Sequence, residues 1–190
     1  MFNKLTKLVV SHKFLKFLFI SPILLSVPLL PHINEAKAGL EFQWDQDSGL
    51  RRLRWFQTDN KRRFRNTIYF FLRPSDRTAG LLKINLAIPY TFKANLKEEK
   101  ISFCKVRIGG FDSRTKCLET VPADIVIKED NSSVEIFPYS PIPSNKDSYG
   151  IVLKVVNPNR SGLFQFHTYG QYVGKSVMDY LGSSTIVLDD

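Results

Sequence analysis

The sequence predicts an all-β fold: a single antiparallel β-sandwich, immunoglobulin-like, with one or two short helical turns. About ten short apolar or alternating runs recur along the chain, separated by turn residues, as in sandwiches and barrels. In addition, one strand leads through a proline-rich corner, Pro141–Pro143, into a strand that begins with Tyr149. Either this Tyr folds its hydroxyl back onto upstream backbone, as in immunoglobulin-like sandwiches, or it is an ordinary interfacial Tyr.

The clearest strand alternates Leu82, Ile84, Leu86 and Ile88 with more polar residues, which places one apolar face on a pleat before Pro89 ends it. In chain order the expected strands are Leu40–Trp44, Leu53–Gln57, Thr67–Leu72, Leu82–Ile88, Ser102–Ile108, Ala123–Ile127, Val134–Phe137, Tyr149–Val156, Leu163–Tyr169 and Ile186–Leu188. Turn residues bound several of them, notably Asp130-Asn131-Ser132 in an expected hairpin and Gly109-Gly110 after a strand. Short helical turns are expected within Thr91–Glu99 and Lys175–Leu181.

The first 38 residues are typical of a secretory signal peptide with cleavage after Ala38. Lys4, Lys7, Lys13 and Lys16 precede an apolar run, Phe17–Leu30, and the segment ends on the small residues Ala36 and Ala38. The alternative is an uncleaved membrane anchor, but the run has 14 residues and two prolines, whereas a spanning helix needs roughly 20 apolar residues. We therefore expect an exported protein, in the periplasm, the extracellular space or a thylakoid lumen.

Removing 38 residues from 190 leaves 152, residues 39–190, which suffices for one exported β domain. This part holds 22 Lys plus Arg and 17 Asp plus Glu, a net charge of +5. The excess is uneven, because residues 51–77 hold nine basic and two acidic residues, and the rest nets −2. The basic stretch is the strongest charge signal after the signal peptide.

The two cysteines, Cys104 and Cys117, both lie in the exported part. In an oxidising compartment an isolated pair is most simply a disulfide, and it closes a loop worth about 3 kcal/mol on the chain-entropy model. A metal site suits them poorly, because the spacing is not a short ligand spacing and no His lies nearby. No metal site and no cofactor is expected.

Catalytic motifs are weak in this chain. His167 is the one histidine of residues 39–190, and no motif names a nucleophile or an orienting group for it. A structural or surface role is therefore favoured for His167. A hydrolase could still use two carboxylates set across a groove, since their spacing in space cannot be read from the sequence.

The basic stretch, residues 51–77, is the one group of residues in the sequence that indicates a particular chemistry, the binding of anions. Its arginines alternate with aromatic residues, and Arg suits bidentate contact with phosphate, sulfate or carboxylate. The simpler interpretation is that these residues form the solvated face of a sheet and a solvated loop. The candidate anion contacts are Arg51, Arg52, Arg54, Arg62, Arg63 and Arg65.

Several stretches resemble a known family across nearly the whole of residues 39–190. They are Arg51-Arg52-Leu53-Arg54, Tyr69-Phe70-Phe71-Leu72-Arg73-Pro74 with Asp76-Arg77, Gly109-Gly110-Phe111 with Ser113-Arg114-Thr115 and Cys117-Leu118-Glu119, Asn157-Pro158 with Arg160-Ser161-Gly162, and Tyr180-Leu181-Gly182. The chain resembles a family of exported cyanobacterial proteins grouped only as a domain of unknown function (DUF2808). The resemblance implies a cyanobacterial-type host, export, and both cysteines belonging to the domain. It implies no activity, cofactor or catalytic residue.

The expected role is therefore a non-enzymatic binding or structural module of the cell envelope. Export favours anionic envelope polymers or lipid head groups as partners over nucleic acid, with membrane contact of the chain itself only through an uncleaved signal. The alternatives are a hydrolase of envelope or extracellular polymer, and an assembly subunit that pairs through sheet edges. The sequence leaves the oligomeric state open.

Overall fold

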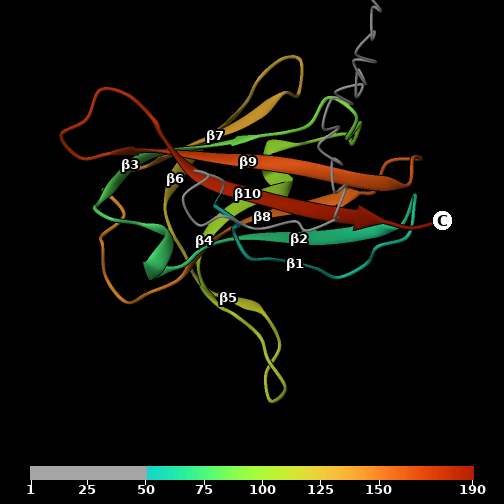
Figure 1. The fold of residues 1–190 in the computed structure, drawn as a ribbon, viewed down its shortest axis with the longest axis horizontal. Helices are drawn as coiled ribbons and strands as arrows, with labels where there is room; N and C mark the ends of the chain where they lie inside the picture. The colour runs from blue at the N-terminus through green and yellow to red at the C-terminus, as the bar shows by residue number, and fades with distance from the viewer. Residues whose placement is uncertain (1–50) are drawn as a thin grey trace, which may run out of the picture. The chain divides into compact units, whose positions relative to one another are not determined.

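A computed structural model describes residues 51–190. The signal peptide with Ala36 and Ala38, the boundary at residue 39 and the expected strand Leu40–Trp44 lie outside the described residues. The predicted antiparallel β-sandwich is confirmed, since the strands of the described part form two five-stranded antiparallel sheets (Figure 1).

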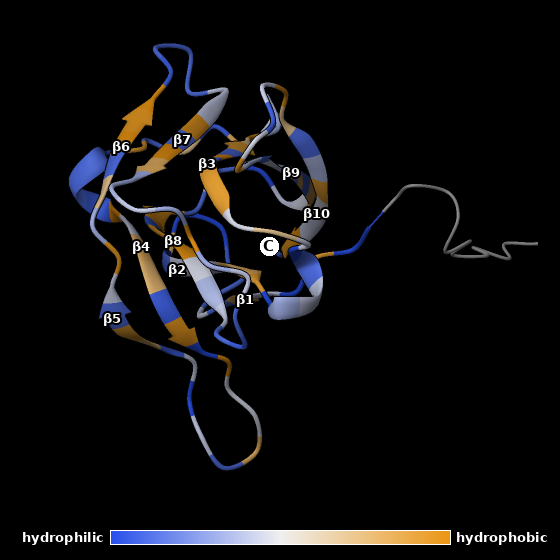
Figure 2. Cartoon of the chain, turned by 90° about the vertical axis from the view of Figure 1, so that its left-hand side faces the viewer, coloured by the Kyte–Doolittle hydropathy of each residue, from blue (hydrophilic) through white to orange (hydrophobic). Residues whose placement is uncertain are grey.

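The two sheets form the two layers of the sandwich, as Figure 2 shows from one side. The first sheet contains, in spatial order, β1 (Trp55–Gln57), β2 (Arg65–Leu72), β8 (Tyr149–Val156), β4 (Ile101–Arg107) and β5 (Lys116–Thr120). The second contains β10 (Asp179–Leu188), β9 (Gly162–Tyr172), β3 (Leu81–Ala87), β7 (Ser133–Pro138) and β6 (Ala123–Ile127). Two 3-10 turns, η1 (Pro74–Asp76) and η2 (Glu98–Lys100), complete the described elements.

Six consecutive strands have immunoglobulin-like connectivity. Strands β3, β7 and β6 are neighbours in the positions of immunoglobulin strands B, E and D, and β8, β4 and β5 are neighbours in those of F, C and C′. The outer positions are exchanged: β2 lies beside β8, where strand G would be, and β9 lies beside β3, where strand A would be. The core of the sandwich is therefore immunoglobulin-like, and its flanking strands are not.

The main core lies between the sheets and is built from alternate residues of the strands. Phe70 and Phe166, from opposite sheets, meet there with ring centroids 4.9 Å apart. The prediction that Leu82 lies on the apolar face of the β3 region is wrong, because its side chain is 39% exposed. A register shift between Leu81 and Lys83 in the pairing with β9 turns Leu81 into the core in its place.

Two further differences concern segments at sheet edges. Strand β5 was not expected, because Lys116–Thr120 is mostly exposed and its pairing with β4 defines it. The helical turn expected within Lys175–Leu181 is wrong, because β10 begins at Asp179 and pairs with β9, with a register shift between Tyr180 and Gly182. The turn η2 lies at the end of the expected helical segment Thr91–Glu99.

Arg77 holds the corner that precedes β8. Its guanidinium is buried, donates hydrogen bonds to the carbonyl oxygens of Pro143 and Asp147 at 2.5 Å each, and lies 4.7 Å from the centre of the Tyr149 ring. Burial lowers the pKa of Arg77. Within residues 51–190 the Tyr149 hydroxyl makes no hydrogen bond, so Arg77 supplies the contacts to upstream backbone that a corner tyrosine would otherwise make.

The expected disulfide between Cys104 and Cys117 is present, with the two Cα atoms 5.7 Å apart. It joins β4 to β5 and belongs to a second apolar cluster, on the outer face of the first sheet, with Phe71, Val106 and Val152. Together, the bond and the cluster fix the base of the β4–β5 loop against the sheet.

A buried amide pair, Asn66 and Asn157, organises the opposite end of the sandwich. Asn66 is 3% exposed and Asn157 2%, and Nδ2 of Asn66 donates to Oδ1 of Asn157 at 3.0 Å. Oδ1 of Asn66 accepts hydrogen bonds from the backbone amides of Thr58 and Asp59, both at 3.1 Å. Nδ2 of Asn157 donates to the carbonyl oxygen of Lys61 at 2.8 Å. The pair therefore ties the β1–β2 loop to the β8–β9 loop.

Replacing both Cys104 and Cys117 with Ser should lower the free energy of unfolding by about 3 kcal/mol, because the unfolded chain regains the entropy of the closed loop. The midpoint of urea unfolding measures this, and wild-type protein unfolded with reductant should match the variant. A thiol count on denatured wild-type protein without reductant should find no free thiol. Two free thiols, or a variant with the wild-type midpoint, would contradict the expectation.

The variant Asn157→Ala should lose about 2 kcal/mol of unfolding free energy, because it leaves the Asn66 amide and the Lys61 carbonyl without their buried partner. Urea unfolding gives the loss, and faster hydrogen exchange in residues 58–64 locates it. Asn159→Ala is the matched control, since Asn159 is exposed two residues away. Equal losses for the two variants would show that the amide pair does not hold this end.

Candidate anion-binding site

The six arginines expected as anion contacts separate into two groups. Arg51, Arg52 and Arg54 run between β10 and β2, where the Ser183 amide donates to the Arg51 carbonyl oxygen at 2.7 Å and the Phe71 amide to the Arg54 carbonyl oxygen at 3.0 Å. The side chains of Arg52 and Arg54 line a depression of about 490 Å³ together with Arg73. The other three arginines lie at the end of the sandwich that the amide pair organises.

That end, here called the basic end, gathers basic side chains from loops and strand ends that are distant in sequence. In Figure 1 the β1–β2 loop, the β8–β9 loop and the C-terminus meet on the right of the molecule. Three depressions lie there, and two of them share Asn159. The basic residues that line them are Lys61, Arg62, Arg63, Arg65, Lys93, Lys97, Lys100, Lys154 and Arg160.

Four of these cations share one depression of about 550 Å³, here called the basic depression. Arg65 comes from the start of β2 and Lys154 from β8, while Lys97 directly precedes η2 and Lys100 ends it. All four side chains are exposed, and no carboxylate lines the depression. Asn66 also lines it, so the buried amide pair lies directly at the base of this cationic surface.

Acidic residues occur at the basic end but are engaged elsewhere. Asp190 forms an ion pair with Arg62, with 3.1 Å between Oδ1 and Nε. Asp189 accepts a hydrogen bond from Asn60 at 2.5 Å. Glu98 and Glu99 lie in η2 without lining the basic depression. Among the described residues, none of the four cations of the depression forms an ion pair.

Sequence patterns did not indicate the lysines of the basic depression as anion contacts, because these lysines lie outside the basic stretch, residues 51–77. Lys97 and Lys100 precede β4, and Lys154 lies near the end of β8. The pairing of Arg65 with Val156 and of Ile101 with Leu153 brings these positions to the same end of adjacent strands. Basic residues at the start of one expected strand and near the end of its antiparallel neighbour were the available signal.

His167 has a hydroxyl partner that no sequence motif indicated. Its Nδ1 lies 2.8 Å from Oγ of Ser183, and that hydroxyl also contacts the hydroxyl of Tyr180. Ser183 is only 8% exposed, and among the described residues no carboxylate bonds to the imidazole as a third group would in a catalytic triad. The contacts are those of a side-chain network on the outer face of the second sheet.

Other chemistries find little support in residues 51–190. No three His, Cys, Asp or Glu side chains gather there as metal ligands would. Of five depressions on this surface, four are lined by no carboxylate and the fifth includes only Asp190, which is paired with Arg62. None of them offers the two facing carboxylates of a glycoside hydrolase. No helix in this range is long and apolar enough to cross a membrane.

Solved structures similar to this chain include the bacterial hydrophobin BslA, at 11% identity and a TM-score of 0.46, with 73% of this chain and 97% of that one covered. A collagen-binding domain from a Staphylococcus aureus adhesin matches at 12% identity and a TM-score of 0.39, over 72% and 97%. A Nocardia farcinica protein described with an immunoglobulin-like fold matches at 10% identity and a TM-score of 0.44, over 73% and 99%.

A comparison with curated protein sequences gives no match. A family model does match, over residues 46–188 and thus over both cysteines and all the basic residues of the basic end. The chain belongs to the family described as protein of unknown function, DUF2808.

Proposed function

We propose that the protein is a non-enzymatic binding module of the cell envelope, which contacts an anionic envelope polymer through the basic end. The single observation that carries this proposal is the basic depression, where Arg65, Lys97, Lys100 and Lys154 converge without a carboxylate. Unpaired cations that converge in one concavity raise the local concentration of anions and accept phosphate, sulfate or carboxylate groups.

Export supports a polymer of the envelope as the partner. The disulfide between Cys104 and Cys117 is a bond that oxidising compartments maintain, and the signal-like first 38 residues agree with it. A polymer suits the basic end better than a single small anion, because neighbouring depressions carry further cations such as Lys93 and Arg160. A chain with repeated charges could contact several of them at once.

Two alternatives have less support. Hydrolysis needs paired acids in a groove, and none of the five depressions described above has two facing acids. Assembly through sheet edges is restricted on one side, where β10 and the β1 region are joined by hydrogen bonds such as that from Gln57 Nε2 to the Val187 carbonyl oxygen, 2.9 Å. On the other side, edge strand β6 exposes Val126, which leaves pairing at that edge as the version to test by light scattering.

The triple variant Lys97→Ser, Lys100→Ser, Lys154→Ser should bind dextran sulfate, a model polyanion, at least about tenfold more weakly than wild type, because three converging charges are lost. Calorimetric titration at several salt concentrations measures the effect, and the salt dependence should become shallower in the variant.

The matched control removes three exposed cations from other parts of the surface: Arg51→Ser, Arg54→Ser, Lys146→Ser. It has the same net charge as the first variant and should bind nearly as wild type does. Equal weakening in both variants would reduce the effect to net charge and contradict a site at the basic end. Binding to phosphatidylglycerol vesicles but not to dextran sulfate would replace the polymer with lipid head groups.

A further inference from the structure

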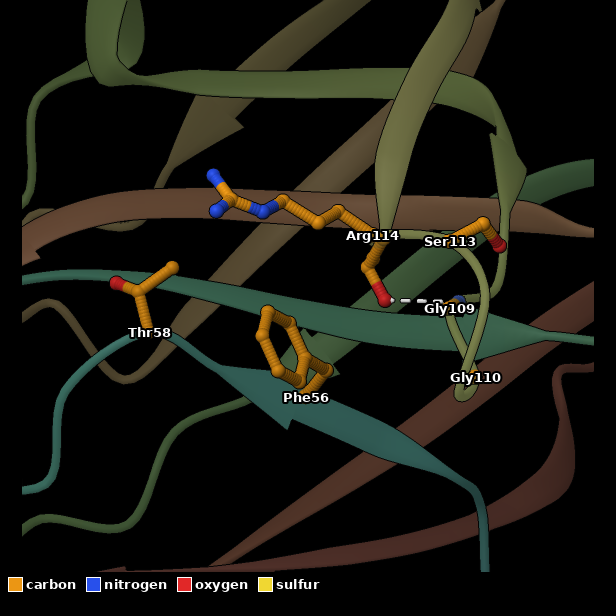
Figure 3. A pocket seen from close by; sticks show the side chains of 7 residues that line it. Phe56, Thr58, Gly109, Gly110, Ser113 and Arg114 are labelled. Carbon is orange, nitrogen blue, oxygen red and sulfur yellow. Dashed lines mark hydrogen bonds between the residues drawn. The ribbon is translucent and has the colours of Figure 1, made fainter.

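A second concavity lies on the outer face of the first sheet, between the edge strand β1 and the β4–β5 loop. This trough has a volume of about 510 Å³, within the usual range of small-molecule sites. It is lined by Phe56, Thr58, Gly109, Gly110, Ser113, Arg114 and Thr115. Figure 3 shows Arg114 reaching from the loop across the opening, on the side where Phe56 and Thr58 of the β1 region lie.

The loop that forms one wall has a defined shape. The Gly109 amide donates to Oγ1 of Thr115 at 2.9 Å, and the Gly110 amide to the Ser113 carbonyl oxygen at 2.9 Å. A Cβ at position 109 would lie 2.6 Å from the Thr115 backbone nitrogen, so only glycine fits there. The Cys104–Cys117 disulfide fixes the base of the loop. Arg114 is therefore presented by a braced turn.

The opposite wall offers an aromatic surface. The Phe56 ring is 39% exposed, and it packs against Tyr69, with ring centroids 6.0 Å apart, so its orientation is supported from the sheet. Oγ1 of Thr58 is already engaged, since it donates to Asn66 and accepts from the Thr67 amide. Thr58 thus shapes the wall, and Arg114 and Ser113 remain as the polar groups for a ligand.

An aromatic face opposite a guanidinium selects a ligand with two matching parts. A pyranose ring has a face of C–H groups that can lie on Phe56 and leave water. A carboxylate on the same ring suits the planar fork of Arg114, which among the described residues forms no ion pair. No acid lines the trough to repel such a group.

We propose that the trough binds a uronic acid residue of an acidic polysaccharide, with its carboxylate on Arg114 and its ring on Phe56. This site is separate from the basic depression and holds whether or not the basic end binds a polymer. It also differs in kind, because the ligand is recognised by a single charge and by a ring rather than by repeated charge.

The test is a calorimetric and NMR titration of the full protein with a hexamer of galacturonic acid, and with the neutral hexamer of galactose as the control ligand. Wild type should bind the acidic hexamer, with shifts of the Gly109 and Gly110 amides. Arg114→Gln should weaken acidic-hexamer binding about tenfold, the loss expected for one charge-assisted pair. Phe56→Ala should weaken it by a similar factor.

Two further variants separate this site from other surfaces. Phe111→Ala removes the fully exposed ring at the tip of the same loop, outside the trough, and should leave binding unchanged. The triple lysine variant of the basic end should show the shifts of the Gly109 and Gly110 amides at wild-type affinity, because those amides report on the trough and not on the basic end. Unchanged binding in Arg114→Gln, loss in the lysine variant alone, equal binding of the neutral hexamer, or no binding to wild type would each overturn the proposal. Arg114 is exposed, so thermal unfolding should show wild-type stability in its variant.

Discussion

The buried hydrogen bond between Asn66 and Asn157 is the interaction on which the basic end depends. The β1–β2 loop carries Lys61, Arg62 and Arg63 and the β8–β9 loop carries Arg160, and like charges in neighbouring loops repel one another. Because both amides are out of water, each must satisfy its donors and acceptors within the protein, which fixes the loop backbones in one arrangement. A neutral network beneath the loops therefore holds these cations together, and of the four only Arg62 also has an acidic partner among the described residues, Asp190.

The β4–β5 loop is held by a different means. No comparable polar network fixes its base among the described residues; instead a disulfide and a small apolar cluster around Phe71 and Val152 attach it to the outer face of the sheet. The two anchors act on opposite walls of the trough. The amide pair holds Thr58 through Asn66, whereas the disulfide and the apolar cluster hold the loop that carries Arg114.

Sequence patterns predicted the strands whose side chains alternate between core and solvent, and β8 was predicted to the residue because Tyr149–Val156 is bounded by polar turns. They failed where pairing decides the structure: Lys116–Thr120 has no apolar face of its own, and β10 begins at Asp179 only because β9 lies beside it. The residues of the candidate site also fall into those that a sequence pattern indicates and those that only strand pairing brings together. The arginines could be found as a run along the chain, whereas Lys154 joins Arg65 only through strand register.

The distribution of charge on the folded surface differs from the distribution along the chain. Residues 39–50 and 78–190 together have a net charge of −2, yet they supply Lys97, Lys100 and Lys154 to the basic depression. Elsewhere on the strands, lysines are paired, as in Lys83 with Glu135 and Lys105 with Asp147, each at 2.9 Å. These hydrogen bonds lower the pKa of both Glu135 and Asp147, so the acids remain charged and neutralise their neighbours. Arg65, Lys97, Lys100 and Lys154 have no such acidic partner among the described residues, so ion pairs do not neutralise their charge. Four cations around one concavity, with no carboxylate in its lining, raise the positive potential there and attract anions.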